Sequence, residues 1–394
     1  MDNLSSNFSR RQLLKILASM PVAYYACGLS GCSNSGKKKD SLLKDINFYG
    51  TGTLDIQKKW AQVDKDLGLK IHFKDNGNEV GPVLTQMIVG TAALDYDIGG
   101  LQGGAERELA QAGKILPWNL EKIPNWKMVW DWAKDIPYAK FKGEQFGLPV
   151  VINADSIIYL PDKVGLVDSY STIFNPEFKG KTAMEDSWIN SVIFTAIYLK
   201  ENGLMKIGDP GNLTSEELKN VMEFLIDKKK EGQFRTFWNG WEEGLRLILN
   251  EDVWAMTGWE PIVYAAQAKG KNVAYAIPKE GYEGWSNDLL LHIGAEKRGL
   301  LEQVHQFANW ELDGFYGCSL GDLRGYAVPS DRGIDYAKHH PDEFDVKKYS
   351  SLLSNVREKF MTMKGRVHWQ NVRPDNYREY EDWWSKLRVT KDLG

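Results

Sequence analysis

The chain contains few cysteines. Its 394 residues include only Cys27, Cys32 and Cys318. The first two lie near the N-terminus, at the end of a segment that we expect to be processed, so Cys318 would remain as the one ordinary thiol. This scarcity excludes an intramolecular disulfide and the class of small secreted domains that disulfides hold together. Stability must then come from apolar burial, and the length predicts two domains rather than one.

A long apolar run is also missing. Residues 16–29 are apolar, but this run is shorter than the roughly 20 residues that a membrane-spanning helix needs. Arg10 and Arg11 precede this run, and Leu-Ser-Gly-Cys ends it at Cys32. Residues 1–31 are therefore interpreted as a twin-arginine-like lipoprotein signal peptide, with Cys32 as the lipidation site and Cys27 as a weaker cleavage candidate. We expect the protein in the periplasm or at the cell surface, anchored to the membrane by lipid.

The chain has no excess of basic charge. Its net charge is −4, and residues 1–31 contribute about +2 of basic charge, which leaves about −6 for the processed chain. A nucleic-acid partner would favour a basic surface, so this balance argues against one. It is weakly compatible with a cationic ligand.

Signatures of catalysis are missing as well. No G-x-S-x-G elbow, H-E-x-x-H helix or Walker-type phosphate loop occurs after residue 31. His339 and His340, with acidic residues at 342, 343 and 345, could form a metal site, but the polar surroundings favour a solvated loop. We therefore expect no cofactor and no metal, and a secreted lipoprotein hydrolase is the less favoured alternative.

From residue 46 onward the pattern alternates strands and helices. Residues 32–44 read as a flexible tether. We expect strands at 46–49, 70–73 and 96–98, helices at 54–67 and from Pro82, and a glycine-rich loop at 99–104. This alternation indicates an α/β lobe with a largely parallel sheet. Ligands bind at the carboxyl ends of such strands, so the loops after Phe48 and Ile98 are candidate walls of a site.

Residues 146–153 form an apolar extended run that predicts a crossover into a second lobe. Within that lobe we expect a helix from 188 to 198 and a capping box formed by Thr214 and Glu217. A return near 283 and a further crossing at 325–329 complete the arrangement. The predicted lobe 1 comprises residues 45–148 and 283–327, and lobe 2 comprises residues 149–282 and 328–394.

Five short motifs occur in order along this frame: Phe-Gly-Leu-Pro at 146–149, Asn-Pro-Glu-Phe-Lys-Gly at 175–180, Ile-Pro-Lys-Glu-Gly at 277–281, Gly-Tyr-x-x-Pro at 325–329 and Trp-Gln-Asn at 369–371. In this order they resemble the spermidine/putrescine-binding proteins of bacterial ABC importers, over residues 46–390. The resemblance implies an α/β fold of the two-lobed periplasmic-binding-protein type II, with crossover hinge strands and a ligand cleft between the lobes. It also implies a monomer that captures a small organic cation of polyamine type and delivers it to an ABC permease.

The resemblance also suggests which residues bind the ligand. In the family, carboxylates pair with the ligand ammoniums and aromatic rings flank the methylenes, because a buried cation needs compensating charge and apolar contact. The candidate ligand-binding residues are Asp186, Trp285, Asn287, Asp288, Tyr326, Gln370, Trp259, Glu260, Trp188 and Tyr49.

Several positions depart from the family pattern. Ile189 stands where a glutamate is expected, and Asn287 where an aspartate is expected, with Asp288 next to it. Gln102 and Gly103 replace a tyrosine, and Gly258 replaces a tryptophan. The missing carboxylates leave open a betaine-like or zwitterionic amine, or a sugar, as the solute.

The candidate residues also have structural interpretations. Asp186 suits the cap of the helix that follows it. Trp285 suits a core wall, and Trp188 and Trp259 suit packing positions. Ferric-ion binding would need clustered tyrosines, of which Tyr326 alone is well placed.

Overall fold

The computed structural model describes residues 44–77, 79–362 and 366–391. The predicted signal peptide 1–31, with Arg10 and Arg11, lies outside these residues, as do Cys32 and the rest of the tether except for Lys44. Among the described residues, no helix combines the length and the apolar character needed to cross a bilayer.

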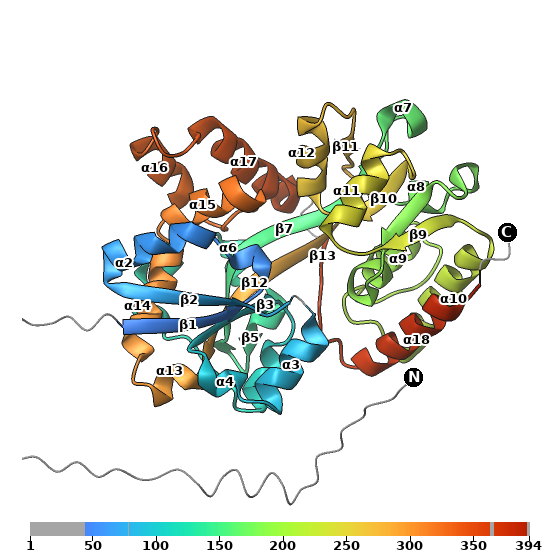
Figure 1. Ribbon diagram of the computed structural model, residues 1–394. Helices are drawn as coiled ribbons and strands as arrows, with labels where there is room; N and C mark the ends of the chain where they lie inside the picture. The colour runs from blue at the N-terminus through green and yellow to red at the C-terminus, as the bar shows by residue number, and fades with distance from the viewer. Residues whose placement is uncertain (1–43, 78, 363–365, 392–394) are drawn as a thin grey trace, which may run out of the picture. The chain divides into compact units, whose positions relative to one another are not determined.

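One sheet of eleven strands runs through both lobes, in the order β2-β1-β3-β12-β7-β10-β8-β9, with β4, β11 and β13 attached beside this path. Helices cover the sheet on both sides (Figure 1). Two long strands at its centre, β7 (Gly147–Tyr159) and β12 (Tyr282–His292), are antiparallel to each other and buried along their whole length. They connect the two lobes, so the predicted two-lobed α/β fold is confirmed.

The first lobe contains β1 (Lys44–Gly50), β2 (Leu69–Asp75) and β3 (Ile98–Gln102), which are parallel to one another as predicted. Ile46 and Phe48 alternate with less buried residues in β1, which gives the strand one core face. Gly99 and Gly100 belong to β3 and not to a loop. A side chain at Gly100 would overlap the side chain of Leu54, so the glycine allows Leu54 to pack directly against the backbone of β3.

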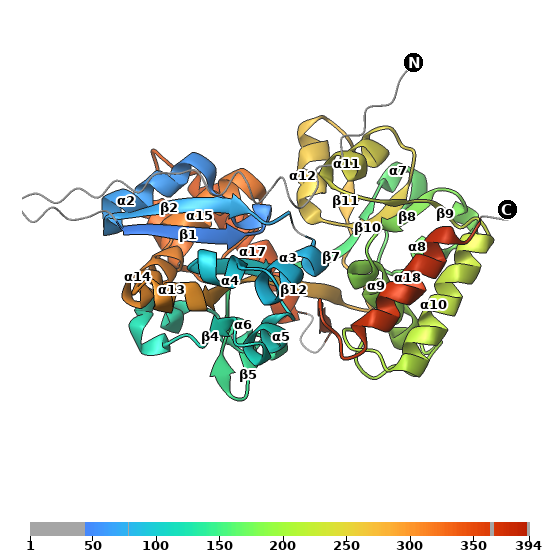
Figure 2. The ribbon, with the colours of Figure 1, turned by 60° about the horizontal axis from the view of Figure 1, so that its bottom comes forward.

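The helices of the first lobe lie on both faces of β1–β3 (Figure 2). Three short strands complete the lobe: β4 (Ile115–Leu116), and β5 (Lys140–Phe141) paired with β6 (Glu144–Gln145) in a hairpin. The helices are α2 (Ala61–Leu67), α3 (Val80–Ile88), α4 (Ala92–Asp95), α5 (Glu106–Gln111), α6 (Asp131–Lys134), α13 (Ile293–Lys297), α14 (Leu301–Glu311), α15 (Phe315–Arg324), α16 (Arg332–His339) and α17 (Val346–Thr362).

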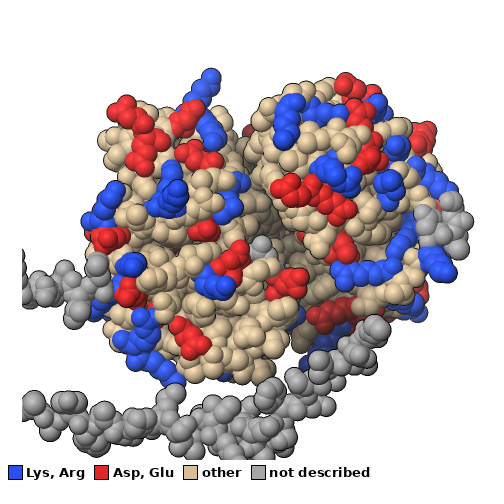
Figure 3. All heavy atoms as spheres, viewed as in Figure 1, with Lys and Arg blue, Asp and Glu red and all other residues tan. Residues whose placement is uncertain are grey.

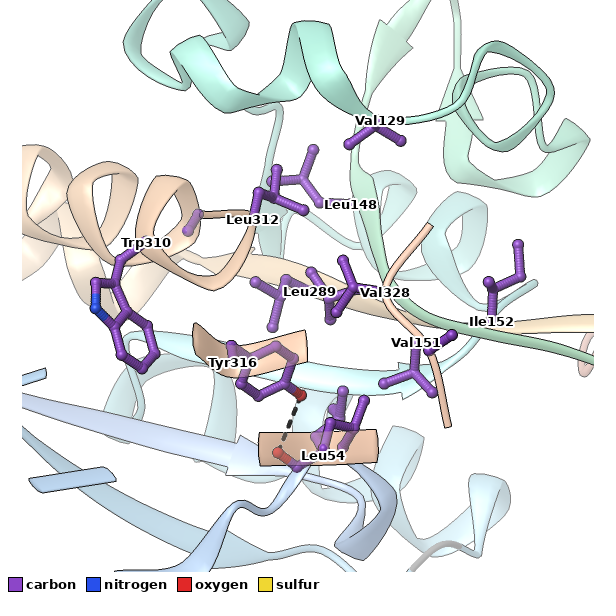
Figure 4. Packing of buried hydrophobic residues seen from close by; sticks show 14 of the residues in the cluster. Leu54, Val129, Leu148, Val151, Ile152, Leu289, Trp310, Leu312, Tyr316 and Val328 are labelled. Atoms are coloured by element: carbon purple, nitrogen blue, oxygen red, sulfur yellow. Dashed lines mark hydrogen bonds between the residues drawn. The ribbon is translucent and has the colours of Figure 1, made fainter. Parts of the chain in front are cut away.

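The predicted boundary at residue 327 is wrong. Residues 328–362 do not belong to the second lobe, because Val328 packs in the same hydrophobic cluster as Leu148 and Leu289 of the first lobe (Figure 4). Buried residues of α17, among them Val356, belong to this cluster too. Tyr316 stabilises the cluster further by donating a hydrogen bond to the backbone oxygen of Leu54 at 3.0 Å.

The second lobe is built on β8 (Thr182–Glu185), β9 (Phe234–Trp238), β10 (Ala255–Gly258) and β11 (Ala274–Tyr275). The predicted capping box is present, since the Thr214 hydroxyl accepts from the backbone N–H of Glu217 while the carboxylate of Glu217 accepts from that of Thr214. The helices are α7 (Pro161–Val164), α8 (Ser171–Phe174), α9 (Trp188–Glu201), α10 (Ser215–Lys230), α11 (Trp241–Leu249), α12 (Glu260–Ala268) and α18 (Tyr377–Val389). After α17 the chain returns to this lobe through β13 (Val367–Trp369), which pairs with β12.

The pairing of the two crossing strands decides which side chains share a face. Glu283 lies opposite Asp155, and Trp285 lies opposite Asn153. Alternate residues of a strand point to the same side of a sheet, so these four side chains leave one face together. The register shifts between Asn287 and Asp288, where the strand bulges.

Candidate ligand-binding site

Three carboxylates from three strands gather where the lobes meet. Asp155 on β7 and Glu283 on β12 are 3% and 0% exposed, and Glu185 ends β8 in the second lobe. Burial is the main cause that raises their pKa values, to about 7 for Asp155 and about 8 for Glu185. The pKa of Glu283 is raised well above its ordinary value by burial and then by the charges of the other two. The three groups therefore lie within electrostatic reach of one another.

Aromatic side chains border this carboxylate cluster. The indole Nε1 of Trp285 donates to Asp155 Oδ2 at 2.8 Å, and the rings of Trp285 and Tyr326 meet edge to face at 5.2 Å. Trp259 donates a side-chain hydrogen bond to Glu185, which counteracts part of the rise in the pKa of that carboxyl. Ring faces and carboxylates at one place are the pair of features that an organic cation needs.

An amide chain links Glu185 to Glu283. Asn190 donates to Glu185 Oε2, and Gln370 donates both to Asn190 Oδ1 and, at 3.0 Å, to Glu283 Oε1. The other oxygen of Glu283 and the amide oxygen of Gln370 are buried and have no hydrogen-bond partner among the described residues. Buried polar atoms are normally paired, so these two acceptors mark a place for a donor from outside the chain.

One ammonium lies at the other end of the cluster. Lys359 of α17 is 4% exposed, and its Nζ lies 2.6 Å from Glu260 Oε2 and 3.0 Å from Asn153 Oδ1. Asn355 donates to the same glutamate at 2.6 Å. The Lys359 charge also lowers the pKa of Asp155, against the larger effect of burial. This end of the cluster is therefore partly neutralised by the protein itself.

Of the predicted ligand-binding residues, Trp285, Tyr326, Gln370, Trp259 and Glu260 lie at this carboxylate cluster. Asn287 projects from the same face of β12 as Trp285 and accepts a hydrogen bond from the Thr51 hydroxyl at 3.3 Å, at the end of β1. That contact connects the expected loop after Phe48 to the site.

Asp186 lies away from the cluster, although the family pattern pointed to it. Its carboxylate accepts from Arg388 Nε at 2.8 Å and from Trp384 Nε1 at 3.0 Å, so it faces α18. The helix that follows begins after Ser187 without a side-chain cap, so the alternative interpretation of Asp186 as a cap is also not seen.

Three further candidates pack elsewhere. Asp288 points to the opposite face from Asn287 and lies beside Glu106, and its charge adds to burial in raising the pKa of the Glu106 carboxyl. Tyr49 stacks on Tyr96 at 4.9 Å. Trp188 packs against Tyr380 at 5.3 Å.

Two glycines stand where the family pattern has an aromatic residue, and at each of them an aromatic ring from another part of the chain occupies the space. A side chain at Gly103 would overlap the ring of Tyr138, whose hydroxyl lies 3.1 Å from Ser286 Oγ. At Gly258 an added Cβ would lie 3.1 Å from the ring of Trp238. Aromatic surface is thus present at both places, supplied from another part of the chain.

Sequence reasoning missed Asp155, Glu185, Glu283 and Lys359. A usable signal existed for two of them, because Asp155 is a charged residue just after the apolar run 146–153 predicted to cross between the lobes, and Glu283 stands at the predicted return near residue 283. Glu185 and Lys359 had no such signal, since their position depends on the packing of α17 and β8 against the crossing strands.

The surface is hollowed between the lobes (Figure 3). A cavity of about 470 Å³ lies beside β13, lined by residues of both lobes such as Arg107, Lys200 and Arg373. Its arginines pair with acidic residues, Arg107 with Asp375 at 2.8 Å and Arg373 with Glu108 at 3.0 Å. The acidic partners do not line the cavity itself, where Lys140 and Lys200 add positive charge against Asp209. This basic lining does not suit a cation, so the carboxylate cluster is the stronger candidate site.

Comparison with known proteins agrees with this geometry. A family model described as bacterial extracellular solute-binding protein matches residues 89–307, more than half of the chain. A putrescine/agmatine-binding protein of Pseudomonas aeruginosa is 23% identical over 213 residues, which cover 50% of this chain and 55% of that protein, so the match spans about half of the relative's length.

Solved structures show the same fold. A spermidine/putrescine ABC transporter protein from Listeria monocytogenes superposes with a TM-score of 0.69 at 15% identity, covering 88% of this chain and 100% of that one. A protein from A. tumefaciens in complex with glucopine superposes with a TM-score of 0.63 at 15% identity, with the same coverage. The resemblance noted in the sequence is therefore confirmed, and the solute-binding interpretation is favoured over a hydrolase. The chain belongs to the family of bacterial extracellular solute-binding proteins.

Proposed function

We propose that this protein is the substrate-binding component of an ABC importer and that it captures a small organic cation of polyamine type. The observation that supports this function is the cluster of Asp155, Glu185 and Glu283, in which no described lysine or arginine pairs with Glu185 or Glu283. A carboxylate buried without a cation is costly, and an incoming ammonium would remove that cost.

The cluster also explains how a ligand would favour closure. Glu283 lies on a crossing strand and Glu185 in the second lobe, while Asn287 and Thr51 belong to the first-lobe side. A solute that contacts both lobes at once has its full set of contacts in the closed form alone, so its binding shifts the population towards closure. The closed form would then dock on the permease.

The remaining parts of the proposal concern location and assembly. The protein would act as a monomer outside the cytoplasm, held near its permease by lipid on Cys32 after export directed by Arg10 and Arg11. The family assignment supports the extracellular location. A label of radioactive palmitate retained by the wild type and lost in Cys32→Ser would support the anchor, and equal labelling of the two would contradict it.

An alternative solute on the same fold is a betaine-like or zwitterionic amine, or a sugar. The glucopine complex of the structurally similar protein favours this alternative, because that fold accommodates such a ligand.

A thermal-shift experiment on the processed chain tests the proposed function. The panel contains butylamine, putrescine, spermidine, glycine betaine and glucose, each added to the wild type and to Glu283→Gln. A ligand at 100 times its dissociation constant should add about 2.7 kcal/mol of stability to the wild type. The shift should shrink in Glu283→Gln and persist in Glu144→Gln, a matched change at an exposed position. A shift with glucose alone, or an amine shift that Glu283→Gln leaves unchanged, would contradict the proposal.

A further inference from the structure

Lys359 is a buried ammonium at the edge of the proposed site. It comes from α17, whereas its carboxylate partner Glu260 begins α12 of the second lobe. Its Nζ also donates to Asn153 Oδ1 at 3.0 Å and to the backbone oxygen of Ala154 at 3.1 Å. All three hydrogen positions of the ammonium are thus used by acceptors, and the group is fixed in place.

The Lys359 ammonium is surrounded by the same kinds of groups that would bind the ammonium of an organic ligand. Its Nζ lies 4.8 Å from the ring centroid of Tyr275 and 5.8 Å from that of Tyr282, in addition to its carboxylate contact. Carboxylate contact combined with aromatic rings is how proteins recognise ammonium groups. Asp155 lies within electrostatic reach of both Lys359 and Glu260, because the charge of Lys359 lowers the pKa of its carboxyl and that of Glu260 raises it. Asp155 thus connects the Lys359–Glu260 pair to the rest of the cluster.

The two ends of the cluster therefore differ. At the Glu260 end the chain supplies its own cation. At the other end, Glu185 and Glu283 are joined through the amides of Asn190 and Gln370, and one oxygen of Glu283 has no partner within the described part of the chain. That second end therefore has carboxyl groups but no cation of its own among the described residues.

We propose that Lys359 acts as a built-in second ammonium that makes the site selective for solutes with a single positive end. This inference rests on the proposed capture of an organic cation at the carboxylate cluster, and it departs from the polyamine part of that function by favouring a monoamine over a diamine. The ammonium of the solute binds at Glu185 and Glu283, while its uncharged part extends along Trp285 and Tyr326 towards Lys359. A diamine of the same length brings its far ammonium towards the Lys359 charge, and the repulsion of like charges weakens its binding.

The test compares two ligands of equal chain length, butylamine and putrescine, by isothermal titration calorimetry at pH 7.5. The wild type should bind butylamine at least tenfold more tightly than putrescine. In Lys359→Met this preference should fall at least tenfold, because Glu260 and Asp155 then become available to the second ammonium. Lys347→Met, the same change at an exposed position of the same helix, controls for the loss of a lysine.

A second variant keeps the test decisive if Lys359→Met does not fold. Lys359→Met combined with Glu260→Gln removes both members of the buried pair, so Glu260 is not left as a buried charge without its lysine. It also removes the repelling ammonium, and the preference for butylamine should fall here too, though less than in Lys359→Met. A wild type that prefers putrescine, or a preference that is equal in the wild type and both variants, would overturn the inference while amine binding stands. Failure of the wild type to bind either amine would instead overturn the proposed function.

Discussion

Replacing Glu185 with glutamine should stabilise the unliganded protein at alkaline pH and leave its stability at acid pH almost unchanged. Glu185 keeps its proton in the folded state up to a pKa of about 8, against 4.5 for an ordinary glutamate, and burial is the largest cause. Since the folded pKa is the higher one, this carboxyl subtracts stability as the pH rises. The loss begins near the unfolded value of 4.5 and is complete above about 8.

The size of the effect follows from the two pKa values. The gap between 4.5 and about 8 corresponds to roughly 5 kcal/mol if it is taken in full. The Glu185 side chain keeps some contact with solvent, which reduces the penalty for its charge. We therefore expect Glu185→Gln to gain about 2 kcal/mol over the wild type at pH 9.

Urea unfolding of both proteins at pH 5, 7 and 9 measures this difference. The two free energies of unfolding should agree at pH 5 and separate progressively towards pH 9. Glu144→Gln, at an exposed position, should follow the wild type throughout. If the difference between Glu185→Gln and the wild type stays constant across this range, the carboxylate cluster is not destabilised by its own charge, and the electrostatic argument for the site fails.

Other perturbations give further expectations. Asp186→Asn should lower the free energy of unfolding by at most about 1 kcal/mol, because Asp186 loses its ion pair with the largely exposed Arg388. Amine affinity measured by calorimetry should stay unchanged, and a large loss of affinity would show that Asp186 contacts the ligand. Gly103→Ala should displace the ring of Tyr138 and reduce both the melting temperature and amine affinity, whereas an unchanged melting temperature would show that the ring has room. Amine affinity should rise between pH 6 and pH 9, since the carboxyls of Asp155 and Glu185, with pKa values of about 7 and about 8, must lose their protons before they compensate an ammonium. A flat profile would argue against a role for these two carboxyls.

The fold could be predicted in large part from the sequence because its signals are local. Alternating strands and helices gave the α/β class, and the apolar run containing Val150 and Val151 gave the first crossing, which is β7. The capping box at Thr214 was also visible, since it involves residues three apart. The assignment of α17 failed because an amphipathic helix does not reveal which of two cores it covers.

The candidate site was harder to predict, because family motifs align positions and not the direction of side chains. Asp186 matched a family carboxylate, yet its partner Arg388 lies in the last helix and draws it away from the cleft. Asp288 was proposed as a neighbour of Asn287, but adjacent residues of a strand face opposite sides, and it points to Glu106.

The sequence also did not reveal that aromatic residues from distant positions replace rings missing at Gly103 and Gly258. The absence of a tyrosine at Gly103 looked like a lost ligand contact, although the ring of Tyr138 covers this glycine. Likewise, Trp238 lies against Gly258 from the neighbouring part of the sheet. Such exchanges require knowledge of which segments approach each other in space, and a single sequence does not contain it.

The interrupted order of the lobes also affects how the chain can fold during synthesis. The core of the first lobe includes Val356 and Phe360 of α17, which emerge from the ribosome after the whole central part of the second lobe. The core of the second lobe is completed still later in synthesis, because it includes Trp384 and Leu387 of the last helix. Contacts between such distant segments form slowly, so neither half can reach its native packing until translation is nearly finished.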